Sequence, residues 1–225
     1  MRRFTTFLVC TLLFGGSVAL ADNAQLQAKV TALKQAIAQN KQMIAQYTWQ
    51  QEETISVKGD VKDQEQYQVQ IGPDGTPQKS LESAPAPAGR PHGIKHRITQ
   101  DYQDYGKQIA ALAQSYAQPD PGKLQQLYQQ GNITLGSAGA PGVVALVIHN
   151  YVKQGDTVTI VFNQAQKTIQ SINVASYLSG PSDAVTVAAQ FGLLGDGTSY
   201  VSNLTVNGSS KSLTVQDVNS NFQKR

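Results

Sequence analysis

The clearest structural signal in the chain is the stretch Gly-Asp-Thr-Val-Thr-Ile-Val-Phe at residues 155–162. It begins with a turn pair, and then apolar side chains recur at every second position, which is the period of a strand with one buried face. The same alternation returns in later stretches that Gly, Asp, Ser and Asn separate; these are residues 172–178, 185–191, 200–206 and 213–218. Because the connections are short, neighbours must pair antiparallel, and the C-terminal part of the chain predicts a meander.

The residues just before this region form an apolar run over 143–151, preceded by a glycine-rich segment over 136–142. Glycine-rich segments can bind phosphate when a helix and a lysine follow them. Here no lysine follows and a strand comes next, so we interpret residues 136–142 as a flexible loop at the rim of the sheet.

In the N-terminal half, the spacing of the apolar side chains changes once, from helical to strand-like. Residues 23–46 place apolar side chains at spacings of three, four and seven, which predicts an amphipathic helix. From Tyr47 the period becomes two, predicting strands up to residue 57 and again over 66–71. The turn Gly72-Pro73-Asp74-Gly75 follows, and a third strand is expected over 76–82.

Residues 83–93 contain three prolines, which cannot donate to a strand ladder, and therefore predict a loop. Helical spacing returns over 96–117, where Pro119 and Pro121 end it, and a short helix is expected over 122–130. We interpret 83–130 as a proline/alanine loop plus a helical insertion within one domain that spans residues 22–225.

These elements predict the α+β class, with a long curved antiparallel β-sheet, a half-barrel, covered on its concave face by helices. The apolar strand faces exceed what three modest helices can cover. Either the sheet curls into a partial barrel, or an apolar groove stays open. Whether the strands form one sheet or two is left open by the pattern.

The N-terminus has the three parts of a secretory signal peptide. Arg2 and Arg3 precede an apolar segment over 4–20, and Ala19-Leu20-Ala21 is a small-x-small cleavage site. We expect cleavage after Ala21 and a periplasmic or secreted protein; the alternative is an uncleaved anchor helix. The single cysteine, Cys10, lies inside the signal, so the mature chain would have no disulfide, which favours a bacterial periplasm.

Composition excludes several classes of protein. Charged residues make up only 15% of the chain and glutamine about one residue in eight. Removal of Arg2 and Arg3 with the signal would lower the formal charge of +3 by two. No electrostatic basis for binding nucleic acid then remains, and no membrane span is expected after cleavage.

Several short motifs resemble one known family. They are residues 47–52 (Tyr-Thr-Trp-Gln-Gln-Glu), 57–59 (Val-Lys-Gly), the turn at 72–75, and the hairpin strand at 155–162 that leads into 169–172 (Ile-Gln-Ser-Ile). In this order they are similar to the outer-membrane lipoprotein carrier superfamily, the LolA-like and RseB-like periplasmic proteins. The resemblance implies a half-barrel closed by helices over a hydrophobic cavity that takes acyl chains. It assigns no function to an individual residue.

The expected function is non-enzymatic binding of an acyl chain or lipidated partner, such as a lipoprotein, in an apolar concavity. Ten side chains are the candidates for its wall: Trp49, Ile55, Tyr67, Val69, Ile160, Phe162, Ile172, Val174, Val187 and Phe191. The alternative is a cell-envelope interaction or sensor module that uses the same sheet with a filled core and no lipid.

No catalytic residue, cofactor or metal is expected. His92 and His96 are four residues apart, but Pro91 and Gly93 argue against a helix that would bring them together, and solvated loop histidines are the better interpretation. Asp101 and Asp104 are interpreted as acids at the start of a helix, where they complement its dipole, rather than as a catalytic pair.

Overall fold

The computed structural model describes residues 17–83, 94–117 and 119–225. These ranges contain three helices: α1 (Ser17–Ile44), α2 (Ile94–Ala117) and α3 (Pro121–Gln129). They contain ten strands: β1 (Tyr47–Val57), β2 (Asp60–Ile71), β3 (Pro77–Ser83), β4 (Ile133–Gly136), β5 (Val143–His149), β6 (Thr157–Asn163), β7 (Thr168–Tyr177), β8 (Ala184–Leu193), β9 (Ser199–Gly208) and β10 (Leu213–Lys224).

All ten strands belong to one antiparallel sheet in the order β3-β2-β1-β10-β9-β8-β7-β6-β5-β4. The predicted meander is confirmed from β5 to β10. The pairing of β1 with β10 joins the N-terminal strands to it, so the strands form one sheet rather than two. The edge strands β3 and β4 do not pair with each other. The sheet is therefore open, which is consistent with the predicted half-barrel of the α+β class.

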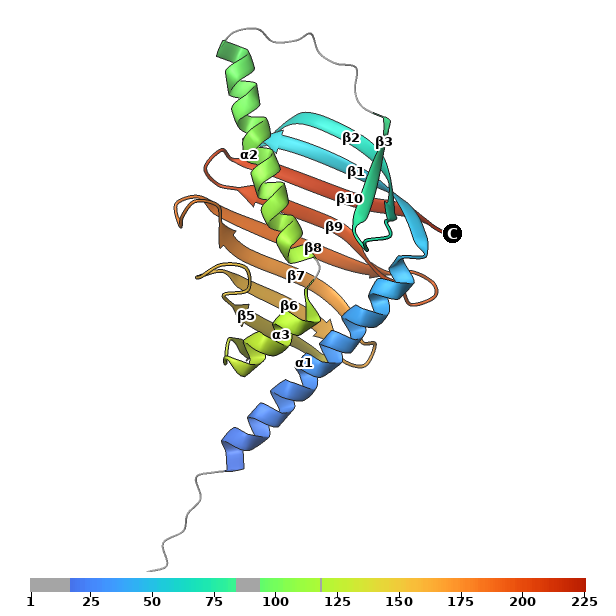
Figure 1. The fold of residues 1–225 in the computed structure, drawn as a ribbon, viewed down its shortest axis with the longest axis vertical. Helices are drawn as coiled ribbons and strands as arrows, with labels where there is room; N and C mark the ends of the chain where they lie inside the picture. The colour runs from blue at the N-terminus through green and yellow to red at the C-terminus, as the bar shows by residue number, and fades with distance from the viewer. Residues whose placement is uncertain (1–16, 84–93, 118) are drawn as a thin grey trace, which may run out of the picture.

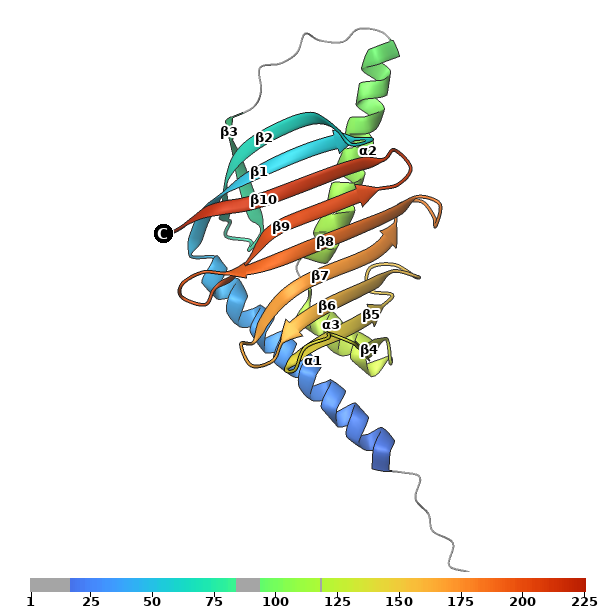
Figure 2. The ribbon, with the colours of Figure 1, turned by 180° about the vertical axis from the view of Figure 1, so that it is seen from behind.

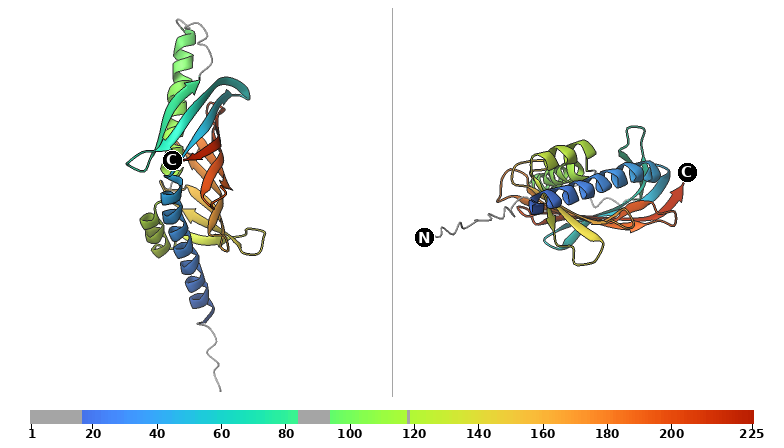
Figure 3. Two further views of the ribbon diagram at one scale, coloured as in Figure 1. Left: turned by 90° about the vertical axis from the view of Figure 1, so that its right-hand side faces the viewer. Right: turned by 90° about the horizontal axis from the view of Figure 1, so that it is seen from below.

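The three helices lie on the same side of the sheet (Figures 1 and 2), and the main core lies between the helices and the strands. The end-on view in Figure 3 shows this arrangement as two layers. The centre of the core is fully buried: Leu33 on α1, Ile109 on α2, Leu124 on α3, and Ile160, Phe162 and Val185 on the strands. Each such side chain contributes roughly 1.5–3 kcal/mol of transfer free energy.

Helix α1 differs from its expected bounds at the N-terminal end. It begins at Ser17 and runs through the predicted cleavage site at Ala21 without a break. Most of the expected signal segment, residues 1–16, lies outside the described residues, so cleavage stays a prediction. None of the described helices combines the length and the hydrophobicity that crossing a membrane requires.

Strand β4 was not predicted. It has only four residues, Ile133–Gly136, and the left-handed Gly131 (φ 74°) precedes it. A segment this short cannot display an alternating pattern, whereas its pairing with β5 aligns Ile133 with Ile148 and fixes it in the sheet. The expected rim loop accordingly starts after Gly136, and the expected loop at 83–93 falls mostly on residues that are not described.

Helix α2 is seated on the sheet by its tyrosines. The Tyr105 hydroxyl donates to Asp183 Oδ1 (2.8 Å), and the ring lies so close to Gly208 that a Cβ there would be 2.5 Å from Cε1. Asp101 and Asp104 are not at the helix start as expected. Because α2 begins at Ile94, both acids lie further along the helix, where Asp101 pairs with Lys211 (3.5 Å).

The end of α2 contacts a buried carboxylate. Asp156, in the turn before β6, is 1% exposed and accepts hydrogen bonds from the backbone N–H groups of residues 151, 152 and 153 (2.6–2.9 Å). The Tyr116 hydroxyl of α2 donates to Asp156 Oδ2 (2.6 Å) and also lies 2.8 Å from Ser176 Oγ. Burial raises the pKa of Tyr116, so this hydroxyl keeps its proton and remains a donor.

A row of carboxylates crosses the other half of the sheet. Asp217 on β10 lies opposite Glu53 on β1, and Glu53 lies opposite Glu65 on β2. Lys79 of β3 pairs with Glu53 (2.9 Å). Burial raises the pKa of Asp217 to about 6, which the attraction of Lys79 only partly offsets.

We expect Asp217→Asn to raise the free energy of unfolding at neutral pH by about 2 kcal/mol. At pH values between the ordinary pKa of an unfolded aspartate and about 6, the Asp217 carboxyl binds a proton more tightly in the folded protein than in the unfolded chain. Stability therefore falls as the pH rises through this window, and the asparagine avoids that loss. Urea denaturation at several pH values measures the free energy of unfolding, and Asp60→Asn, at an exposed position, is the control. Destabilisation by Asp217→Asn that grows as the pH rises above the ordinary pKa of aspartate would show that the Lys79 attraction outweighs burial.

Candidate ligand-binding cavity

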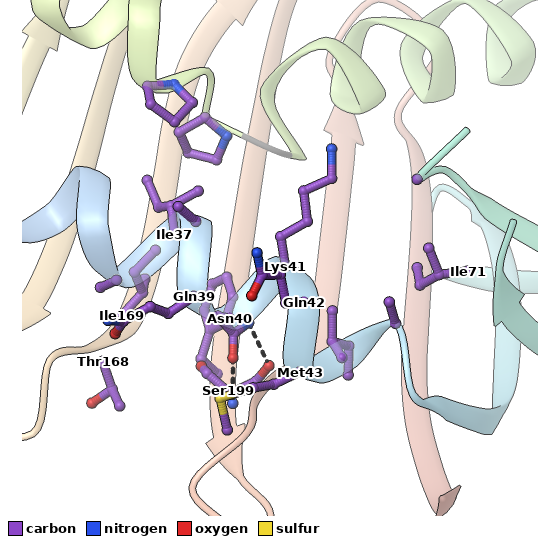
Figure 4. Close-up of a pocket in the computed structure, with 18 of the residues that line it drawn as sticks. Ile37, Gln39, Asn40, Lys41, Gln42, Met43, Ile71, Thr168, Ile169 and Ser199 are labelled. Carbon is purple, nitrogen blue, oxygen red and sulfur yellow. Dashed lines mark hydrogen bonds between the residues drawn. The ribbon is translucent and has the colours of Figure 1, made fainter. Parts of the chain in front are cut away.

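A cavity of about 870 Å³ lies at the end of the sheet where α1 finishes. Its volume is within the range of small-molecule sites in proteins. One wall is residues 36–44 of α1 with Ala45 after it, and the others come from the β2–β3 turn, the α2–α3 junction, the β6–β7 turn and the strand ends beneath (Figure 4). The cavity therefore joins segments from most of the length of the chain.

The surface of the cavity nearest the sheet is apolar. Ile169 and Ile172 of β7 and Phe191 of β8 line it from the strands, and Ile37 and Met43 line it from α1. Phe191 and Ile169 are only half-buried. Apolar side chains that line a cavity without being fully covered are able to gain free energy when a ligand covers them.

Asn40 fixes α1 above this surface. Its amide nitrogen donates to the Ser199 carbonyl oxygen (2.9 Å), and its Oδ1 accepts from the Ser199 backbone N–H (2.7 Å), as the dashed lines in Figure 4 show. The side chain thus substitutes for a strand partner at the start of β9. The Ser199 hydroxyl oxygen is buried, and no hydrogen-bond partner for it occurs among the described residues.

Arg225 holds the two residues that directly follow α1. The Arg225 guanidinium donates to the Ala45 carbonyl oxygen (2.6 Å), and the Arg225 backbone N–H donates to the Gln46 carbonyl oxygen (2.8 Å). Carbonyls at a helix end have no partner within the helix. A cation that satisfies them also complements the negative end of the helix dipole, so the position of α1 is well defined at this wall.

The β2–β3 turn forms the wall opposite the α2–α3 junction. The Gly75 N–H donates to the Gly72 carbonyl oxygen (2.9 Å), and Gly75 has a φ of 78°, which glycine adopts without strain. Asp74 accepts from the Thr76 backbone N–H (3.0 Å) and hydroxyl (2.7 Å), and these bonds lower its pKa. The turn predicted from its sequence is therefore rigid and forms part of the site.

The α2–α3 junction contributes a helix start. Asp120 is the N-cap of α3 and its Oδ1 accepts from the Lys123 backbone N–H (2.6 Å), while Pro121 follows at the first helical position. The Asp120 backbone N–H donates to the Tyr151 hydroxyl (2.8 Å). The junction is thus pinned to the β5–β6 loop, and the Asp120 carboxylate is already engaged in capping.

The ten predicted wall residues are distributed over three places. Ile172 and Phe191 line the cavity, and Ile172 is at the same time a buried core residue that is 3% exposed. Ile160, Phe162, Val174 and Val187 belong to the buried core, and half-buried Ile55 packs against it. Trp49 and Val69 are buried on paired strands, with Trp49 stacked on Phe222, and half-buried Tyr67 lies 5.2 Å from the Lys79 ammonium. A ligand role for these residues stays a prediction.

Sequence reasoning missed most of the cavity because its wall is helix and turn rather than strand. The apolar stripe of α1 includes Ile37 and Ile44, which line the cavity, and this stripe was the one sequence signal for the α1 wall. Nothing in the sequence marked Lys41 or Ser199. Within the described part of the chain, no three His, Cys, Asp or Glu side chains gather as metal ligands would. His92 and the side chain of His96 lie outside it.

No protein family model matches the sequence, and no curated protein matches it. Two solved structures are similar in overall arrangement. A DUF1329 family protein from Desulfovibrio piger ATCC 29098 is 9% identical, with a TM-score of 0.43, over 87% of this chain and 92% of that chain. A protein domain from Vibrio parahaemolyticus, named for outer membrane lipoprotein sorting, is 7% identical, with a TM-score of 0.42, over 84% of this chain and 91% of that chain. Likeness at this level assigns neither family nor function.

Proposed function

We propose that this is an exported, non-enzymatic protein of the cell envelope that binds an acyl chain or the lipid part of a partner. The ligand would occupy the cavity between α1 and the sheet, with the helices covering the concave face of a half-barrel. The observation that carries the proposal is the cavity itself, about 870 Å³ in volume, with an apolar surface formed by Ile37, Ile169, Ile172 and Phe191.

The free energy for binding would come from removing alkyl groups from water. Each buried CH₂ contributes about 0.8 kcal/mol, so a chain of a dozen carbons gains roughly 10 kcal/mol before ordering costs are subtracted. Those costs consume much of the gain. A net affinity that still allows release is what a carrier requires, and the polar side chains on the rim would let the headgroup stay hydrated.

The structure favours this function over a module with a filled core in one specific respect. The centre of the sheet is filled, since α2 and α3 bury Ile109 and Leu124 against it. The end beneath the last turns of α1 is not, and there the side chains of β7 and β8 line open space. Ile169 and Phe191 at that end stay half-buried, so a ligand in the cavity could cover them further.

The test is a native mass spectrum of the mature chain, from Asp22 onward, purified from a periplasm without detergent. We expect an adduct with the mass of one acyl-bearing molecule, which lipid extraction would then identify. The neutral probe N-phenyl-1-naphthylamine should also gain fluorescence with the delipidated protein. An adduct-free mass together with no probe fluorescence would contradict the proposal and favour the interaction module.

A further inference from the structure

The headgroup of the ligand is indicated by the charges around the cavity. Two lysines, Lys41 and Lys167, are among the described residues that line it, together with one acid, Asp120. The Asp120 carboxylate caps α3 and is engaged with the Lys123 backbone. The lining therefore carries an excess of positive charge, although the expected mature chain as a whole is close to neutral.

Lys41 is the better placed of the two cations. It extends from α1 across to the β2–β3 turn, so that a Cβ built on Gly75 would lie 3.0 Å from its Cε and 3.1 Å from its Nζ. The ammonium group thus lies where two walls of the cavity meet, and its stem packs against the turn. Figure 4 shows Lys41 on α1 among the residues that line the cavity.

Among the described residues, no side chain forms a hydrogen bond or a close ion pair with this ammonium group, although the Asp74 carboxylate interacts with it over a longer distance. The Lys41 charge helps to lower the pKa of Asp74, but this carboxylate accepts its two hydrogen bonds from Thr76, forms no ion pair with Lys41 and does not line the cavity. An exposed lysine without a partner is ordinary on a protein surface, but one at the edge of an apolar cavity can pair with a ligand.

We infer that the bound chain is an anionic amphiphile whose acidic headgroup, a carboxylate or a phosphate, pairs with Lys41 where α1 meets the β2–β3 turn. This inference rests on the proposed function. The alkyl part lies on Ile37, Ile169, Ile172 and Phe191, and the headgroup stays at the rim, where water reaches it. Lys167, on the β6–β7 turn, is the second cation of the lining and adds to the positive potential.

The inference implies that the protein prefers ligands by the charge of their headgroup rather than by the length of their alkyl chain. A charge-assisted hydrogen bond at a partly exposed site contributes on the order of a tenfold change in affinity. An acid should therefore bind more tightly than the alcohol of the same length. The preference should shrink at high ionic strength, because the pair is at the rim and salt screens it.

The test uses displacement of N-phenyl-1-naphthylamine from the mature protein by dodecanoic acid, dodecyl phosphate and dodecanol. We expect the acid and the phosphate to displace the probe about tenfold better than the alcohol. Lys41→Gln should remove most of that ratio and Lys41→Arg should restore it. The exposed Lys107→Gln on α2, which removes the same charge, should leave the ratio as in the wild type.

The outcomes separate the two proposals. Equal displacement by all three compounds in the wild type overturns the inference but supports an acyl-binding cavity. The inference is also overturned if Ser199→Ala loses the preference for the acid over the alcohol while Lys41→Gln keeps it. A neutral hydroxyl would then hold the headgroup. Failure of the probe to bind, together with an adduct-free native mass, overturns both proposals. The tighter of the acid and the phosphate identifies the headgroup chemistry.

Discussion

Asp156→Ala is expected to lower the free energy of unfolding by about 4 kcal/mol. The carboxylate accepts three backbone N–H groups of the loop after β5 and the hydroxyl of Tyr116, all within 2.6–2.9 Å. Alanine leaves the three backbone N–H groups, which are buried or partly buried, without this acceptor, and each unsatisfied donor costs about 1–3 kcal/mol. The loss also removes the hydrogen bond that fixes Tyr116, near the end of α2, to the turn before β6.

Urea denaturation followed by tyrosine and tryptophan fluorescence measures this loss. Asp156→Asn keeps one carbonyl oxygen and should cost clearly less than alanine. The control is Asp104→Ala on the exposed side of α2, which should change stability by no more than about 0.5 kcal/mol. A cost for Asp156→Ala as small as that of the control would mean that water replaces the carboxylate and that the network does not hold α2.

This network illustrates what the sequence can and cannot predict. Gly155-Asp156 is recognisable as a turn, and the strand after it follows from its alternating side chains. The partner of Asp156, however, is Tyr116 on a helix that precedes it by 40 positions. Local patterns carry no information about which helix covers which turn. The same limit applies to the β1–β10 pair, whose register aligns Tyr47 with Lys224 across nearly the whole chain.

The cavity was harder to predict than the fold for a related reason. Alternation identifies the buried face of a strand, and it correctly placed Ile160, Phe162, Val174 and Val187 on that face. Whether a helix fills the space above each side chain depends on where the helix lies. Here α2 and α3 cover one part of the sheet, and the last turns of α1 leave room above Ile172 and Phe191.

Ile37→Trp is expected to weaken binding of N-phenyl-1-naphthylamine by more than about tenfold. Ile37 is half-buried and lines the cavity from α1, on the helix that Asn40 fixes to β9. Because this clamp and the Arg225 contacts hold α1 in place, the larger indole has to extend into the cavity rather than push the helix away. It would then occupy the space that an alkyl chain needs.

The matched control is Ala111→Trp, which adds the same indole to an exposed position of α2 outside the cavity lining. Circular dichroism melting of both variants establishes that they are folded, and a titration with the probe compares their affinities. Wild-type affinity in a folded Ile37→Trp protein would place the probe away from α1 and contradict the cavity as the binding site. Weak binding by Ile37→Trp alone would show that the open space beneath α1 is where the apolar ligand binds.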